Sequence, residues 1–214
     1  DNALYHAPAF FSPVRNKLFD TTSDGCLVSE SSEVRCSMSQ RDSGYARVAF
    51  DQYETPEWAT KALLPHLPPV VAIWEPACGS GKMSSALTKA GYYVFETDIQ
   101  RGVDFLSTAI IPKDIPAIVT NPPYSCATAF IEQALRLTQS SSGLVAMLLR
   151  TDFDHAKSRR HLFADHPAFM KKLVLTKRIQ WFEDSKSSPS FNHAWFIWSW
   201  LNDGAPELAY HFED

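Results

Sequence analysis

The stretch "WEPACGSGKMSSAL", residues 74–87, runs from an apolar strand end through a turn with two glycines into a helix. Gly79 and Gly81 let the backbone pass close to a ligand, because no Cβ stands in the way. The residues from Lys82 to Ala90 are predicted to form a helix that Gly91 closes. The stretch therefore predicts a strand–turn–helix unit, a local structure that often wraps a nucleotide-like ligand.

Short apolar strands alternate with helices along most of the chain. The helix that follows residue 54 begins with Thr55 as a predicted N-cap and Pro56 in its first turn. This alternation predicts an α/β fold, in which a mostly parallel, doubly wound sheet has helices on both faces. Ligands of such sheets bind at the carboxyl ends of the strands. Strands are predicted at 70–74, 92–98, 117–121, 143–150, 171–179 and 193–200, and helices at 55–64, 82–90, 125–138 and 155–163.

The chain of 214 residues is long enough for one domain and a tail. Residues 1–45 are rich in Ser, Asp and Arg without sustained periodicity, and we expect them to form a flexible segment. Residues 46–214 are predicted to form the folded domain. Met38 would be a plausible native start, so we expect the first 37 residues to be dispensable.

Composition excludes several classes of protein. No signal peptide is apparent at the N-terminus, and the runs "LVAMLL" and "AWFIWSWL" are too short to span a bilayer. The four cysteines form no CxxC pair, which argues against a disulfide framework or a zinc knuckle. His155, His161 and His166 are spaced by six and five residues, which does not place metal ligands on one helical face. We expect a cytoplasmic protein with no membrane association and no metal site.

The glycine turn departs from two common nucleotide-binding patterns. An ATP P-loop has GxxxxGK[ST], but here Pro76 takes the first glycine position and Met83 follows Lys82. A dinucleotide turn has GxGxxG, but Ser84 takes the third glycine position. Pyrophosphate binding is therefore weakly supported.

Two acidic residues indicate a different ligand. Glu75 ends the strand before the turn, and Asp98 ends the next strand, 17 residues beyond Gly81. A carboxylate at the position of Asp98 accepts the hydroxyls of a ribose in dinucleotide sites. A ribose without pyrophosphate, beside an acid that attracts an ammonium group, is typical of S-adenosylmethionine.

The motif "NPPY", residues 121–124, follows the predicted strand 117–121. Its two prolines stiffen the turn and remove two N–H donors, so carbonyl groups face outward. Alone the motif could be only a rigid turn. Its place at a strand end downstream of the glycine turn favours a functional role.

Taken together, "EPACGSG", "ETDI" and "NPPY" resemble the class I S-adenosylmethionine-dependent amino-methyltransferases, and most closely the adenine-N6 DNA methyltransferases. The resemblance covers residues 45–210 and implies a seven-stranded, mostly parallel Rossmann-like sheet with an antiparallel C-terminal strand. It implies S-adenosylmethionine as the cofactor, with the segment "YETPEW" over its methionine end and Asp104 near its adenine. The implied cofactor-binding residues are Tyr53, Thr55, Pro56, Glu75, Pro76, Ala77, Cys78, Gly79, Gly81, Asp98, Ile99, Asp104, Phe105 and Asn121.

The same resemblance implies a mechanism in which Asn121, Pro122, Pro123 and Tyr124 hold the target amine. The Asn121 side-chain oxygen and the Pro122 carbonyl would accept its two N–H groups and turn its lone pair toward the methyl group. Tyr124 would stack on a base extruded from DNA, with Trp181 or Phe182 on the opposite face. Arg150 ends the next predicted strand, 143–150, where the rim of the cleft is expected, and it is therefore a candidate for contact with the substrate.

The distribution of charge is uneven. Residues 150–178 contain eight Lys or Arg and three Asp, so this stretch carries +5 and the remainder of the chain −9. A solvated surface and a phosphate-contacting edge both explain this pattern, and the second favours nucleic acid, above all DNA, as the partner. Larger family members carry a separate target-recognition domain, whereas here only the helix near 155–165, the loop 183–190 and the tail are available for recognition. A short recognition site, a single-stranded substrate and help from another subunit therefore stay open. RNA bases and protein glutamine side chains also stay open as acceptors, because NPPY serves methyltransferases that act on any planar NH₂ group, as does a non-catalytic subunit that binds S-adenosylmethionine or nucleic acid.

Overall fold

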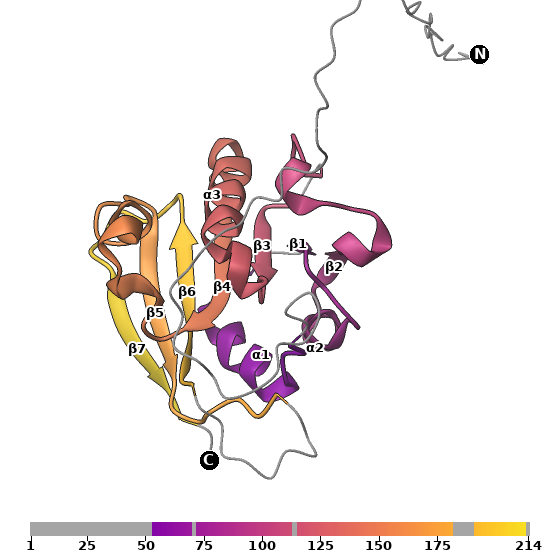
Figure 1. Ribbon diagram of the computed structural model, residues 1–214, viewed down its shortest axis with the longest axis horizontal. Coiled ribbons are helices and arrows are strands. Elements are labelled where there is room, and N and C mark those ends of the chain that lie inside the picture. The colour runs from indigo at the N-terminus through magenta and orange to yellow at the C-terminus, as the bar shows by residue number, and fades with distance from the viewer. Residues whose placement is uncertain (1–52, 70–71, 113–114, 182–190, 213–214) are drawn as a thin grey trace, which may run out of the picture. The chain divides into compact units, whose positions relative to one another are not determined.

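A computed structural model describes residues 53–69, 72–112, 115–181 and 191–212, which all belong to one compact unit, residues 36–214. The expected flexible segment 1–45 lies outside the described residues. Seven strands form one sheet in the order β2-β1-β3-β4-β6-β5-β7 (Figure 1). The strands are β1 (Ala72–Glu75), β2 (Tyr93–Glu96), β3 (Ala117–Thr120), β4 (Leu144–Arg150), β5 (Phe169–Leu175), β6 (His193–Ser199) and β7 (Glu207–His211).

The sheet is mostly parallel, as expected from the sequence. β1 pairs in parallel with β2 and β3, β3 with β4, and β5 with β7. β6 alone among these strands runs antiparallel, and it lies between β4 and β5. The expected α/β fold with an antiparallel strand near the C-terminus is confirmed.

Helices cover both faces of the sheet, with α1 and α2 together on one side and α3 on the other (Figure 1). The α-helices are α1 (Glu57–Leu63), α2 (Lys82–Lys89) and α3 (Ala127–Thr138). Short 3-10 helices complete the connections: η2 (Leu64–His66), η3 (Ile99–Arg101), η4 (Phe105–Ser107), η5 (Tyr124–Cys126), η6 (Gln139–Ser141), η7 (Phe153–His155) and η8 (Lys157–Leu162).

Two hydrophobic cores, one on each face, explain why the central strands read as continuous apolar runs. β1, β3 and most of β4 are buried on both faces, as parallel strands between two layers of helices must be. Trp74 and Trp198 are fully buried on the α3 side, whereas Trp195 is fully buried on the α1 side. The buried indole nitrogens all donate hydrogen bonds: Trp74 to the Thr97 hydroxyl, Trp198 to the Leu162 carbonyl and Trp195 to the Ala59 carbonyl.

The structure corrects several boundaries. Pro56 itself occupies the N-cap position of α1, and no side chain caps that helix, so Thr55 is not the cap. The predicted basic helix 155–163 is the 3-10 helix η8 after a separate turn, η7. The strand predicted at 171–179 begins two residues earlier and ends at Leu175. The edge strand β7 had not been located in the sequence.

Candidate active site

The glycine turn lies between the end of β1 and the start of α2, as predicted. Gly79 and Gly81 have φ angles of 53° and 89°, in the left-handed region that residues with a side chain rarely adopt. The Gly81 amide donates to the Cys78 carbonyl at 2.8 Å, which closes the turn before Lys82 begins the helix. These two glycines are therefore required by the backbone conformation.

Asp98 fixes the turn from the neighbouring strand. It follows β2, is nearly buried, and its two carboxylate oxygens accept the amides of Gly79 and Gln100, each at 2.9 Å. One carboxylate oxygen thus binds the glycine turn and the other caps η3. Because each carboxylate oxygen has two lone pairs, the group can accept further donors from a ligand.

Glu75 ends β1 and is 2% exposed. The Ser84 hydroxyl, one turn into α2, donates to its carboxylate. Burial raises the pKa of Glu75 from its ordinary value of 4.5 to about 8, although the Ser84 hydrogen bond acts in the opposite direction. At neutral pH, the side chain is therefore mostly protonated and would ionise when a cation binds beside it.

Asn121 follows β3, and a second segment orients its side chain. Its Nδ2 donates to the Tyr53 carbonyl at 2.9 Å. With the amide nitrogen held there, the Asn121 Oδ1 remains the acceptor end of the side chain. The next residue, Pro122, is buried, and Tyr124 begins η5.

Four aromatic rings from four segments lie together next to this turn. The ring of Tyr53 is 6.2 Å from that of Tyr124 and 5.4 Å from that of Trp181. His193, the first residue of β6, stacks on Tyr124 at 6.2 Å and meets Trp181 edge-on at 5.1 Å. Burial lowers the pKa of His193 to about 4, with Arg150 acting in the same direction, so this imidazole is neutral at neutral pH. Sequence reasoning missed His193, because an isolated histidine in an apolar strand gave no signal.

A cleft of about 680 Å³ joins these parts at the carboxyl ends of β1, β2 and β3. Both the glycine turn and Asn121 line it. Of the residues predicted to bind cofactor or substrate, those that line the cleft are Tyr53, Thr55, Glu75, Pro76, Ala77, Cys78, Gly79, Asp98, Ile99, Asp104, Phe105, Asn121, Pro123 and Trp181.

Other predicted residues lie elsewhere. Pro56, Gly81, Pro122, Tyr124 and Arg150 are not among the lining residues, although all of them except Arg150 directly adjoin a lining residue in the chain. Phe182 lies outside the described residues. Sequence reasoning also missed nine lining residues, most of them next to predicted ones: Glu54, Ser80, Lys82, Met83, Gln100, Val103, Leu106, Cys126 and Phe130.

The cleft is acidic, which limits the ligands that it can hold. Its lining includes the carboxyl groups of Glu54, Glu75, Asp98 and Asp104 and the ammonium group of Lys82, so the acidic groups outnumber the basic one even when Glu75 is protonated. Lys82 forms an ion pair with Glu54 at 2.8 Å. A polyphosphate would meet net repulsion here, whereas a ligand with positive charge and free hydroxyl groups would be attracted.

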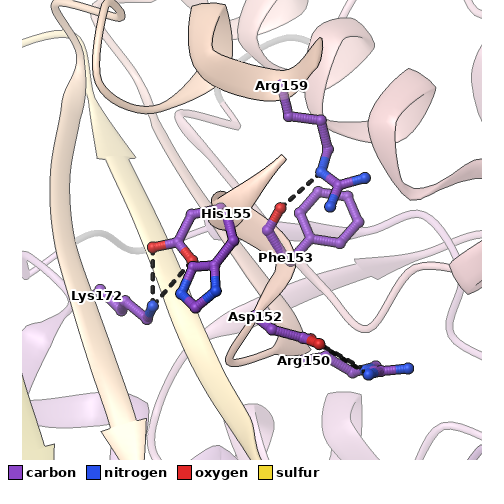
Figure 2. A network of polar contacts seen from close by, with 7 residues as sticks. Arg150, Asp152, Phe153, His155, Arg159 and Lys172 are labelled. Atoms are coloured by element: carbon purple, nitrogen blue, oxygen red, sulfur yellow. Dashed lines mark hydrogen bonds and ion pairs between the residues drawn. The ribbon is translucent and has the colours of Figure 1, made fainter. Parts of the chain in front are cut away.

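Most cations of the basic stretch 150–178 have partners within the chain. Figure 2 shows part of this network: Arg150 pairs with Asp152 at 2.9 Å, and Lys172 binds Asp154 at 2.8 Å. Arg159 donates to the Phe153 carbonyl at 2.6 Å and lies over that residue's ring. Outside the view, Arg160 pairs with Asp165 and Lys171 with Glu207. Arg150 also lies over the ring of Phe191. Four of the eight cations thus pair with carboxylates, and three more make other contacts within the chain: Arg159 as above, Lys177 over the ring of Trp58, and Arg178 with the side chain of Asn192. The stretch is therefore a weaker phosphate-binding edge than its composition suggests.

The described residues contain neither a cluster of metal ligands nor a helix that could span a membrane. Within 53–69, 72–112, 115–181 and 191–212, no group of three or more His, Cys, Asp or Glu could hold a metal ion. None of the helices in these ranges has both the length and the hydrophobicity that crossing a bilayer requires.

Comparison with known proteins gives matches in structure only; no family model and no curated protein matches the chain. The methyltransferase subunit of a type I restriction-modification system from Streptococcus thermophilus matches with a TM-score of 0.50 and 14% identity, over 71% of this chain and 45% of that one. A provisionally assigned class I S-adenosylmethionine-dependent methyltransferase of Listeria monocytogenes matches with a TM-score of 0.48 and 12% identity, over 72% and 61% of the two chains. The type IIG restriction endonuclease BpuSI matches with a TM-score of 0.48 and 12% identity, over 69% and 26%.

The chain spans less than two thirds of the length of each of these three proteins. At these identities, the likeness concerns the arrangement of the backbone and not the chemistry of the site. The chain therefore has the α/β fold of the S-adenosylmethionine-dependent methyltransferases, with its cleft at the carboxyl edge of the sheet.

Proposed function

We propose that this chain transfers a methyl group from S-adenosylmethionine to the exocyclic N6 amine of adenine in DNA. One observation supports the proposal above all others: the glycine turn and the Asn121 amide line the same cleft. A donor held by the turn and an amine held by Asn121 would then lie close enough to react.

The residues of the cleft suit S-adenosylmethionine. Asp98 has lone pairs for the ribose hydroxyls, and its position is fixed by two backbone amides. Ile99 and Phe105 offer apolar contact for the adenine ring, and Asp104 lies in the same part of the lining. Glu75 lies beside the turn, where its ionised form would attract the positive charge of the methionine end. A volume of about 680 Å³ is within the range of small-molecule sites.

Bound S-adenosylmethionine supplies a methyl group on a positively charged sulfur, which leaves as a neutral thioether when a nucleophile attacks the methyl carbon. Adenine N6 is a poor nucleophile, because its lone pair is delocalised into the ring. Asn121 Oδ1 would accept one N–H of this amine, since the Tyr53 carbonyl holds the amide nitrogen. With the Pro122 carbonyl accepting the second N–H, the lone pair of N6 would point out of the ring plane. Positioning and polarisation of the amine then account for most of the catalysis.

The ring cluster supports a planar base as the substrate. Tyr53 and Trp181 line the cleft. The ring of Tyr124 packs against that of Tyr53, and the ring of His193 packs against that of Trp181. Extrusion of a base from a duplex costs a few kcal/mol, and stacking on one aromatic side chain contributes about 1–3 kcal/mol. One or two of these rings could thus offset extrusion. The likeness in fold to the methyltransferase subunit of a restriction-modification system supports DNA as the acceptor.

The test is incubation of the purified chain and S-adenosylmethionine, labelled in the methyl group, with DNA, with RNA and with protein in separate reactions. We expect label in DNA. Label in RNA alone or protein alone would refute DNA as the substrate while leaving the methyltransferase activity. An Asn121→Ala variant should bind S-adenosylmethionine but transfer no methyl group.

The matched control is Asn202→Ala. The Asn202 amide also holds a backbone carbonyl, that of Gly204 at 3.0 Å, but it does not line the cleft. This variant should retain activity. Equal activity of the two variants would show that Asn121 has no special role.

A further inference from the structure

The outer edge of the sheet at β7 presents an exposed apolar surface. β7 pairs with β5 on one side, and no described strand pairs with its other side (Figure 1). Leu208, Tyr210 and Phe212 alternate along this edge and are 59%, 55% and 70% exposed. The rings of Tyr210 and Phe212 stack at 6.5 Å. Proteins usually protect an open edge with lysine, proline or a bulge, but Glu207–His211 contains no lysine, proline or glycine.

The backbone of β7 also has hydrogen-bonding groups directed outward. The Thr176 amide donates to the His211 carbonyl at 3.2 Å, so His211 directs its backbone groups toward β5. Because neighbouring residues of a strand face opposite sides, Glu207 and Ala209 share this direction, whereas Leu208 and Tyr210 direct their N–H and C=O groups away from β5. A strand added outside β7 would therefore bond to Leu208 and Tyr210.

The sequence "ELAYH" of β7 is complementary to itself when one copy is reversed. With Ala209 opposite Ala209, Glu207 lies opposite His211 at both ends, and Leu208 lies opposite Tyr210. This register also makes Leu208 and Tyr210 the hydrogen-bonded pair, which their outward backbone groups require. The apolar contacts between Leu208 and Tyr210 then lie on one face of the paired strands. The two Glu207–His211 pairs lie at the ends of the other face.

We propose that two copies of this chain form a dimer through antiparallel pairing of their β7 strands, in the register centred on Ala209. The pairing joins the two sheets into one and covers Leu208, Tyr210 and Phe212 of both copies. The clefts of both copies stay open, because none of their lining residues belongs to β7. The surface is distinct from the proposed methyl-transfer site.

The first test is sedimentation velocity of the full chain over a range of concentrations. The wild-type chain should shift from the mass of a monomer to that of a dimer as its concentration rises. Tyr210→Lys should raise the dimer dissociation constant about tenfold or more, since symmetry applies each substitution twice. Tyr93→Lys is the matched control, because Tyr93 is 64% exposed on β2 at the other edge of the sheet. It should dimerise like the wild type.

A wild-type chain that stays monomeric at the highest concentration would overturn the proposal. So would a dimer that Tyr210→Lys leaves intact, since a different surface would then form it. Because Tyr210 is more than half exposed, this variant is expected to fold, and circular dichroism checks that it does.

A mixing experiment tests the register. Glu207→Lys places lysine opposite His211 in a dimer of like chains, and His211→Glu places glutamate opposite Glu207. Each variant alone should dimerise less than the wild type. An equimolar mixture should recover the dimer, because the introduced lysine then lies opposite the introduced glutamate at one end, and the other end keeps Glu207 opposite His211. A mixture no better than its components would refute the register centred on Ala209.

Discussion

Replacement of Glu75 by glutamine tests whether burial controls the ionisation of this site. Glu75 is 2% exposed, and burial raises its pKa from 4.5 to about 8. Between these pH values, the folded chain holds a proton that the unfolded chain has released. The free energy of unfolding should therefore fall as the pH rises, and this cost should be complete above the folded pKa. From pH 5 to pH 8, the loss from this one group is roughly 3–4 kcal/mol.

Glutamine keeps the shape and the hydrogen bond from Ser84 but cannot ionise. Urea unfolding, followed by tryptophan fluorescence at pH 5, 7 and 8, would give the free energy of unfolding of both proteins. The difference between Glu75→Gln and the wild type should change by several kcal/mol in favour of the variant as the pH rises. The control is Asp165→Asn, where a half-exposed carboxylate pairs with Arg160 at 2.9 Å. Its removal should cost at most about 1 kcal/mol. Curves for Glu75→Gln and wild type that stay parallel within about 1 kcal/mol would refute the reasoning.

Three further predictions concern the cleft. Asp98→Ala should weaken S-adenosylmethionine binding by roughly 10- to 100-fold, because hydrogen bonds to a charged group contribute about 1.5–3 kcal/mol each. An unchanged dissociation constant by calorimetry would contradict the ribose contact. Binding of S-adenosylmethionine at pH 7 should release a proton from Glu75, so the calorimetric enthalpy should vary with the ionisation enthalpy of the buffer in the wild type but not in Glu75→Gln. Trp181→Ala should raise the KM for DNA by roughly 5- to 150-fold through the loss of about 1–3 kcal/mol of stacking, with S-adenosylmethionine affinity unchanged; an unaltered KM would place the base elsewhere.

Much of the fold could be predicted from the sequence, because the central strands are buried on both faces and their apolar runs stand out. The location of the cleft could also be predicted, because Glu75, Asp98 and Asn121 each end or follow a parallel strand. The carboxyl ends of such strands meet at one edge of the sheet. β7 was missed because only one face of it is apolar, and because the turn around Gly204 that precedes it connects it to β6, whereas it pairs with β5. Its partner was set by tertiary packing and not by the local pattern.

The charge pattern was harder to interpret from the sequence. Residues 150–178 appeared strongly basic, yet Asp152, Asp154 and Asp165 pair with three of these cations. Lys171 finds its partner, Glu207, on a strand 36 positions away. Counting charges along the chain cannot show pairs that only folding brings together. His193 was missed because its neighbours Tyr124, Arg150 and Trp181 belong to other segments and meet it only in the folded chain.

The most direct test of the central claim is mass spectrometry of nucleosides from DNA incubated with the chain and S-adenosylmethionine carrying a deuterated methyl group. We expect N6-methyladenine that carries the deuterated methyl group with the wild-type chain, and none with Asn121→Ala. Unmodified adenine from DNA that covers varied sequences, although the chain binds S-adenosylmethionine, would contradict the central claim.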